Sequence, residues 1–263
     1  MMNIVIENLI SLLCEGAFQA KRSIMPMSEF KWRILYKLAV IEDVAPYIYK
    51  GVLSHEYDSY LNIPTEVKDQ LAASTFNEAD DIDSNFDIED IEKQKLSYIV
   101  KRYTLKDIVY KERHSIDTSK ITLDLLAIIL QNTNAILRNG IRLRGITELG
   151  IFLRTKGQLV DFVKLEAWIQ RLKLKKMSRL QASVLTQIFG FTQDEFPYIK
   201  KNDKRAKPLA EKSIYRVYRA NKLNRPFSKY NISNSIRFYG YSHSEAICKA
   251  TSTIVRNLSE IEE

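Results

Sequence analysis

Two aspartates separated by one residue, Asp81 and Asp83, are the sharpest candidates for chemistry in this sequence. On a strand, this spacing places both carboxylates on one face, where they can hold Mg²⁺ for phosphoryl or nucleotidyl transfer. Such chemistry also needs a glycine-rich turn whose backbone N–H groups cradle the phosphates, and no glycine occurs between Gly51 and Gly140. Residues 78–92 hold eight acidic side chains, so the spacing arises easily by chance. We therefore assign no catalytic residue and keep Asp81 and Asp83 as candidates only.

A basic segment offers a different chemistry. Residues 200–229 hold eleven Lys or Arg residues against two acids, and a helix is predicted over residues 209–221. In that helix two tyrosines, at positions 215 and 218, alternate with two arginines. Arginine with aromatic side chains suits phosphate contact combined with base stacking, although tyrosines at helical spacing can equally be packing residues. The candidate residues for nucleotide or nucleic-acid binding are Lys204, Arg205, Arg216 and Arg219.

Metal and thiol chemistry find little support in the sequence. None of the three histidines, at positions 55, 114 and 243, lies three or four residues from another histidine or a cysteine, so no metal site is predicted. Cys14 and Cys248 lie within helical patterns and are interpreted as small hydrophobic residues in a reduced, cytoplasmic protein. We expect no cofactor, and Mg²⁺ only if Asp81 and Asp83 form a real site.

The composition predicts the scaffold that must position these residues. The chain has 263 residues, 45% hydrophobic and 27% charged, with only eight glycines and six prolines. Few turn residues favour long helices with short connections over sandwiches and barrels. We expect a mainly α multi-helix bundle. No apolar run approaches the length of a membrane span, and the first residues do not resemble a secretion signal.

The centre of this bundle is predicted at residues 119–157. Apolar residues surround almost the whole of the first helix, which is typical of a helix in the middle of a bundle. Ser119 is its predicted N-cap, Gly140 ends it, and a second helix over 143–156 ends at Gly157.

Helix boundaries are predicted elsewhere in the chain as well. Ser28, Asp43 and Asp161 are each expected to cap the N-terminus of a helix, and Gly190 is expected to end one.

Four parts of the chain are predicted around this centre. They are an N-terminal helical part over 1–73, an acidic linker or remnant of a catalytic core over 74–118, a central helical bundle over 119–199, and a basic C-terminal helical segment over 200–263 that packs on the bundle. Residues 96–110 are ambiguous, because their β-branched and aromatic content favours strand while their apolar residues can also share a helix face. A small two-stranded element is therefore an alternative there.

The helical parts resemble a family of bacterial uncharacterised nucleotidyltransferase-like proteins. The resemblance covers residues 4–72, with FKWRILYKLAVIEDVAPYIYKGVL, and residues 121–258, with ILRNGIRLRGITELGIFLRTKG and SIRFYGYSHSEAICKATSTIVRNL. It implies that a small catalytic sheet with a Lys-Gly segment and a Gly-Asp-Ile-Asp-type metal motif should lie between these parts. Here residues 73–120 are too few for that sheet, and Asp80 stands where the motif has glycine.

Three functional hypotheses follow from this departure. The first is a non-catalytic helical scaffold or interaction protein, derived from a nucleotidyltransferase, that binds a protein partner. The second is a divergent Mg²⁺-dependent nucleotidyltransferase using Asp81 and Asp83. The third is a nucleic-acid-binding protein that uses residues 200–229, with charge reversal at Arg216 and Arg219 as its test. Whether the chain is an enzyme stays open, with the sequence favouring a protein that is not.

Overall fold

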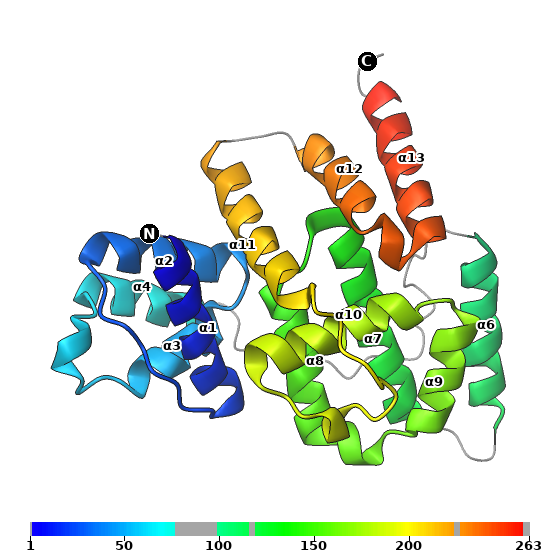
Figure 1. Cartoon of the computed structure of the whole chain (residues 1–263), viewed down its shortest axis with the longest axis horizontal. Coiled ribbons are helices and arrows are strands. Elements are labelled where there is room, and N and C mark those ends of the chain that lie inside the picture. Colours follow the sequence, from blue (N-terminus) through cyan, green and yellow to red (C-terminus); the bar gives the residue numbers. More distant parts are fainter. Residues whose placement is uncertain (1, 77–98, 116–118, 224–226, 260–263) are drawn as a thin grey trace. The chain divides into compact units, whose positions relative to one another are not determined.

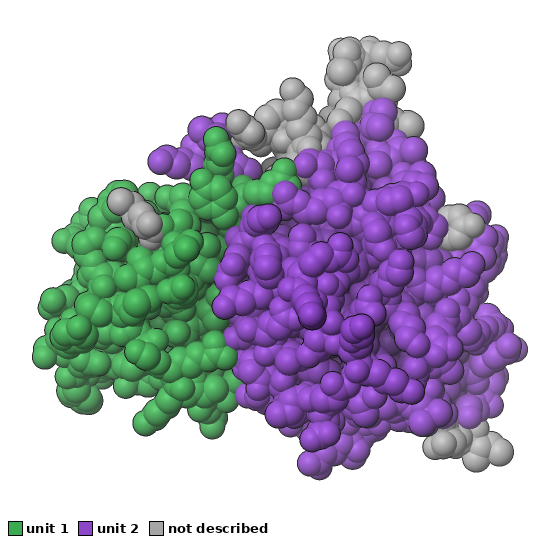
Figure 2. All heavy atoms as spheres, in the orientation of Figure 1, with its two compact units in different colours: residues 1–84, 214–219 green, residues 85–213, 220–263 purple. Residues whose placement is uncertain are grey.

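The computed structural model describes residues 2–76, 99–115, 119–223 and 227–259, and within these ranges every regular element is a helix (Figure 1). The prediction of a mainly α multi-helix bundle is confirmed. The chain divides into two compact units, residues 1–84 with 214–219 and residues 85–213 with 220–263 (Figure 2). We call them unit 1 and unit 2. No described helix is both long enough and apolar enough to cross a lipid bilayer.

Unit 1 is built from helices near the N-terminus. They are α1 (Met2–Phe18), α2 (Glu29–Ile41), α3 (Ala45–Leu53), a 3₁₀ turn η1 (Ser59–Leu61) and α4 (Thr65–Phe76). Ser28 precedes α2 as its predicted N-cap, whereas the predicted cap at Asp43 is wrong. Asp43 adopts a left-handed backbone with φ 58°, and Val44 takes the N-cap position of α3.

Two glycines bring α1 and α3 into close backbone contact. A Cβ atom added to Gly16 would lie 1.8 Å from the Tyr47 carbonyl oxygen, and one added to Gly51 would lie 2.3 Å from the Leu12 carbonyl oxygen. Only residues without a side chain permit such an approach. Trp32, Leu35 and other large apolar side chains fill the rest of this core, so steric fit defines unit 1.

Unit 2 holds the remaining helices. They are α6 (Ile99–Arg113), α7 (Lys120–Asn139), α8 (Leu143–Lys156), η2 (Gly157–Leu159), α9 (Phe162–Arg171), α10 (Lys175–Val184), η3 (Leu185–Phe189), η4 (Gln193–Glu195), α11 (Ala206–Lys222), α12 (Phe227–Arg237), η5 (Tyr239–Tyr241) and α13 (His243–Ser259). Residues 214–219 of α11 are assigned to unit 1.

The predicted central helix is confirmed as α7. Its apolar side chains are buried almost all round, and it packs against α8, α9, α10, α12 and α13. Gly140, with φ +83°, ends the helix as predicted. Two side chains of α12 satisfy carbonyls in its last turn, because Ser235 donates to the Leu137 oxygen at 2.9 Å and Asn234 to the Arg138 oxygen at 3.2 Å.

The strand alternative for residues 96–110 is wrong over 99–110, since these residues lie in α6. One stripe of α6, formed by Lys101, Leu105, Ile108, Val109 and Glu112, is buried. This spacing is helical. The burial of one helix face therefore outweighs a local propensity that favours strand. Other predicted boundaries are confirmed at Asp161, which caps α9, and at Gly190, which follows a π-helical turn at the end of α10.

Candidate anion-binding site

The candidate metal ligands Asp81 and Asp83 lie outside the described residues. Among the residues that are described, no group of three His, Cys, Asp or Glu side chains is placed to hold a metal ion. The enzyme hypothesis also requires strands close to the two aspartates, but residues 99–110 form a helix.

The basic segment is described from residue 200 to 223, and in unit 2 its cations point to solvent. Over residues 200–212 the exposed basic residues are Lys200, Lys201, Lys204, Arg205, Lys207 and Lys212. The two acids of the same stretch each pair with one of these cations. Asp203 is 8% exposed and its Oδ1 atom lies 3.4 Å from Arg205 Nε, while the half-buried Glu211 lies 4.0 Å from Lys207 Nζ. We call these six cations the basic surface.

Asp203 anchors the basic surface to the body of unit 2. Its carboxylate accepts hydrogen bonds from the Tyr241 hydroxyl at 2.6 Å and from the backbone N–H of Arg205 at 2.9 Å. Its own backbone donates to Ser183 Oγ at 2.7 Å and accepts from Gln187 Nε2 at 2.6 Å. These bonds tie the turn before α11 to α10, η3 and η5, so the neighbouring cations start from a fixed backbone.

Electrostatics favour the charged form of Asp203. Burial alone would raise its pKa, but hydrogen bonds from Tyr241 and Arg205 outweigh burial and hold the pKa below its ordinary value. Burial and the adjacent carboxylate both raise the pKa of Tyr241, which therefore stays a donor at neutral pH. The Arg205 guanidinium lies 5.3 Å from the centre of the Tyr241 ring, within the range of a cation–π contact.

The four predicted binding residues divide between the two units. Lys204 and Arg205 are exposed members of the basic surface in unit 2. Arg216 is half-buried and Arg219 is exposed, and both belong to the part of α11 that is assigned to unit 1. The basic surface therefore contains only the first pair.

Sequence reasoning missed a buried cluster of charges in unit 2. Lys101 of α6 is 4% exposed and donates to Ser242 Oγ at 3.0 Å. Glu245 of α13 is fully buried, and its charge acts on both Lys101 and Lys249. The signal in the sequence is the spacing of Glu245 and Lys249, which lie four residues apart on one face of α13, just after Ser242.

The two lysines of this cluster have lowered pKa values. Burial lowers the pKa of Lys101, and burial with the nearby Arg138 charge lowers the pKa of Lys249 to about 8. The Lys249 ammonium donates to Asn134, at 2.6 Å to Oδ1 and 3.2 Å to the backbone oxygen. The cluster thus links α6, α7 and α13 through polar contacts.

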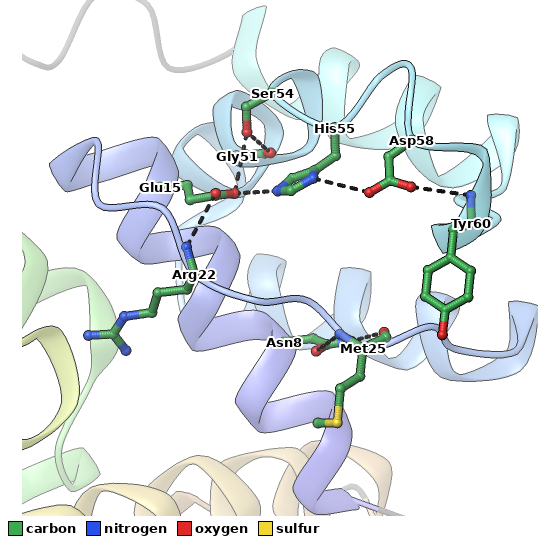
Figure 3. A network of polar contacts seen from close by, with 9 residues as sticks. All are labelled: Asn8, Glu15, Arg22, Met25, Gly51, Ser54, His55, Asp58 and Tyr60. Carbon is green, nitrogen blue, oxygen red and sulfur yellow. Dashed lines mark hydrogen bonds and ion pairs between the residues drawn. The ribbon is translucent and has the colours of Figure 1, made fainter.

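A smaller polar network lies in unit 1 (Figure 3). The Nε2 atom of His55 lies 2.6 Å from Glu15 Oε2, and its Nδ1 atom lies 3.8 Å from Asp58 Oδ2. Glu15 also accepts from the Arg22 backbone N–H at 3.4 Å, while Asp58 caps η1 through the Tyr60 N–H at 3.3 Å. These contacts join α1 to the segment after α3, and we interpret them as a structural clamp.

Comparison with protein-family models, with curated proteins and with solved structures found no match for this chain.

Proposed function

We propose that this protein is a non-catalytic helical binding protein that holds nucleic acid on the basic surface of unit 2. The observation that carries the proposal is the arrangement of charge. Six cations face solvent over residues 200–212, while the carboxylate of Asp203 is turned inward and bonded to Tyr241. In this proposal, the helical parts that resemble nucleotidyltransferases supply the scaffold.

A surface of this kind suits a phosphate backbone. Each ammonium or guanidinium that neutralises a phosphate releases a condensed counterion, which drives binding at low salt. Phosphates need many exposed donors rather than one deep pocket, and exposed lysines and arginines contact them without reading sequence. The anchored turn keeps Lys204 and Arg205 in place, so less freedom is lost when they bind.

The decisive experiment reverses charge on the basic surface. A variant with Lys200→Glu, Lys201→Glu and Lys204→Glu is titrated with a fluorescent 20-base-pair DNA and a 20-nucleotide single strand at several salt concentrations. We expect wild type to bind with a steep salt dependence. In the variant, the magnitude of the slope of log K against log salt should be smaller by about 3, one for each lost phosphate contact.

The matched control carries Lys37→Glu, Lys50→Glu and Lys176→Glu. These lysines are exposed but lie outside the basic surface, so the change in net charge is the same. Equal loss of binding in the two variants would show that only the net charge of the protein matters, and would contradict the proposal. Mg²⁺-dependent nucleoside triphosphate turnover that disappears with Asp81→Ala and Asp83→Ala would contradict its non-catalytic part.

A further inference from the structure

The outer face of α6 combines aromatic rings with positive charge. Tyr103 and Tyr110 are 68% and 63% exposed, although large apolar side chains are usually withdrawn from water. They are seven residues apart, which is close to two helical turns, so they lie on the same face about 10 Å apart along the axis. Lys106 lies between them, with Arg102 and Arg113 beyond, and all three are exposed.

Both acids of α6 are bonded to other cations. Asp107 accepts from Arg171 Nη2 at 2.6 Å and from Lys111 Nζ at 3.1 Å. Glu112 is buried and accepts from Lys164 Nζ at 3.1 Å. The outer face is therefore basic between its rings, which complements an anionic partner.

Contacts in unit 2 connect α6 with the basic surface. At the start of α6, Lys101 bonds to Ser242 at 3.0 Å. The preceding residue, Tyr241, donates to Asp203 at 2.6 Å and carries the Arg205 guanidinium over its ring. Both basic features thus rest on residues 241–242 of the same unit.

We infer that the outer face of α6 binds single-stranded nucleic acid by stacking its bases on Tyr103 and on Tyr110, whose ring centre lies 4.3 Å from that of His114, while Lys106 contacts phosphates. Stacking on aromatic rings beside a basic track is how proteins hold single strands without reading their sequence. This inference rests on the proposed function, because the basic surface supplies the electrostatic attraction that it extends.

The test compares two fluorescent probes with the same phosphates, a 20-nucleotide oligothymidylate and a 20-unit abasic strand. We expect wild type to bind oligothymidylate at least about 10-fold more tightly, since stacking contributes strongly for each base. The double variant with Tyr103→Ala and Tyr110→Ala should lose this preference and keep its affinity for the abasic strand. Replacement of both tyrosines by phenylalanine should retain the preference, because the rings remain.

The control removes two exposed tyrosines of unit 1, Tyr57→Ala with Tyr60→Ala, which are 96% and 69% exposed. It should leave the preference unchanged. Equal binding of both probes by wild type would overturn the stacking inference and leave the proposed function standing, whereas no binding of either probe would overturn both. Displacement of oligothymidylate by poly-glutamate as effectively as by oligothymidylate itself would also overturn stacking, and would indicate an acidic protein partner.

Discussion

The interiors of the two units differ in kind. Among the described residues, the buried polar side chains of unit 1 are Asn8, Ser11 and Glu42. Unit 2 buries many more, among them the amides of Asn132 and Gln181 and five charged side chains: Lys101, Glu112, Asp124, Asp203 and Glu245. Buried polar groups lower stability unless they are bonded to one another, and in unit 2 most of these bonds join different helices.

The stability of unit 1 therefore depends mainly on close packing, whereas that of unit 2 also depends on hydrogen-bonded charges in its interior. In unit 1 close helix contact comes from Gly16 and Gly51, so added volume should be the most damaging change. In unit 2 the groups that carry the proposed function are fixed by hydrogen bonds, so lost charges and lost bonds should matter there. The following predictions test this contrast, beginning with the largest expected effect.

Gly51→Ala should strongly destabilise unit 1. The new Cβ would lie 2.3 Å from the backbone oxygen of Leu12, and a helix backbone cannot yield as a flexible side chain does. We expect a loss of about 3 kcal/mol or more in the free energy of unfolding of this unit. Hydrogen exchange in α1 and α3 would report the loss locally, and unchanged protection there would contradict close packing as the basis of unit 1.

Asp203→Asn should destabilise unit 2 by about 1–2 kcal/mol at pH 7, because it weakens the charge-assisted bonds from Tyr241 and Arg205. The folded pKa of Asp203 lies below its unfolded value. The stabilisation is therefore present above about pH 4 and is lost as pH falls through the folded pKa. Denaturant titrations from pH 7 to pH 3 should show the two proteins converging, and a constant difference would exclude a role for the charge.

Lys249→Met tests whether the partly buried ammonium of Lys249 lowers the stability of the folded state. The pKa of Lys249 is about 8 when folded, below the ordinary lysine value of about 10.4, so the folded state binds fewer protons between these pH values. Wild-type stability should then rise with pH across that window relative to the variant, by about 1 kcal/mol after allowing for partial exposure. Lys176→Met, at an exposed position, is the control and should give no such slope.

Local patterns predict the scaffold better than the sites. The all-round apolar surface of α7, the Asp161 cap and the left-handed Gly190 each depend on residues a few positions apart, and these predictions are confirmed. Residues 99–110 are ambiguous in sequence because β-branched and aromatic residues suit strands, and only the packing of α6 decides for helix.

The sites depend on pairs that are distant in sequence. Asp203 belongs to a charged stretch and is typical of a solvated residue, yet its partner Tyr241 lies 38 positions away. Lys101 and Ser242 are 141 positions apart, and no spacing rule connects them. Among the predicted binding residues, Lys204 and Arg205 can be found from the local density of basic residues alone. The bond between Asp203 and Tyr241 that anchors them cannot be found in this way.

The smallest expected effect has the opposite sign and sharpens the contrast between the two units. Gly157 follows α8 in unit 2 with φ −59°, an ordinary helical value, and a Cβ atom added there would have no neighbour within 4 Å. Gly157→Ala should therefore stabilise the protein by about 0.4–1 kcal/mol, because alanine restricts the unfolded chain without straining the folded one. It is also the matched control for Gly51→Ala, since both add one methyl group to a helical glycine. Destabilisation of similar size at both positions would show that loss of glycine, rather than the α1–α3 contact, explains the first result.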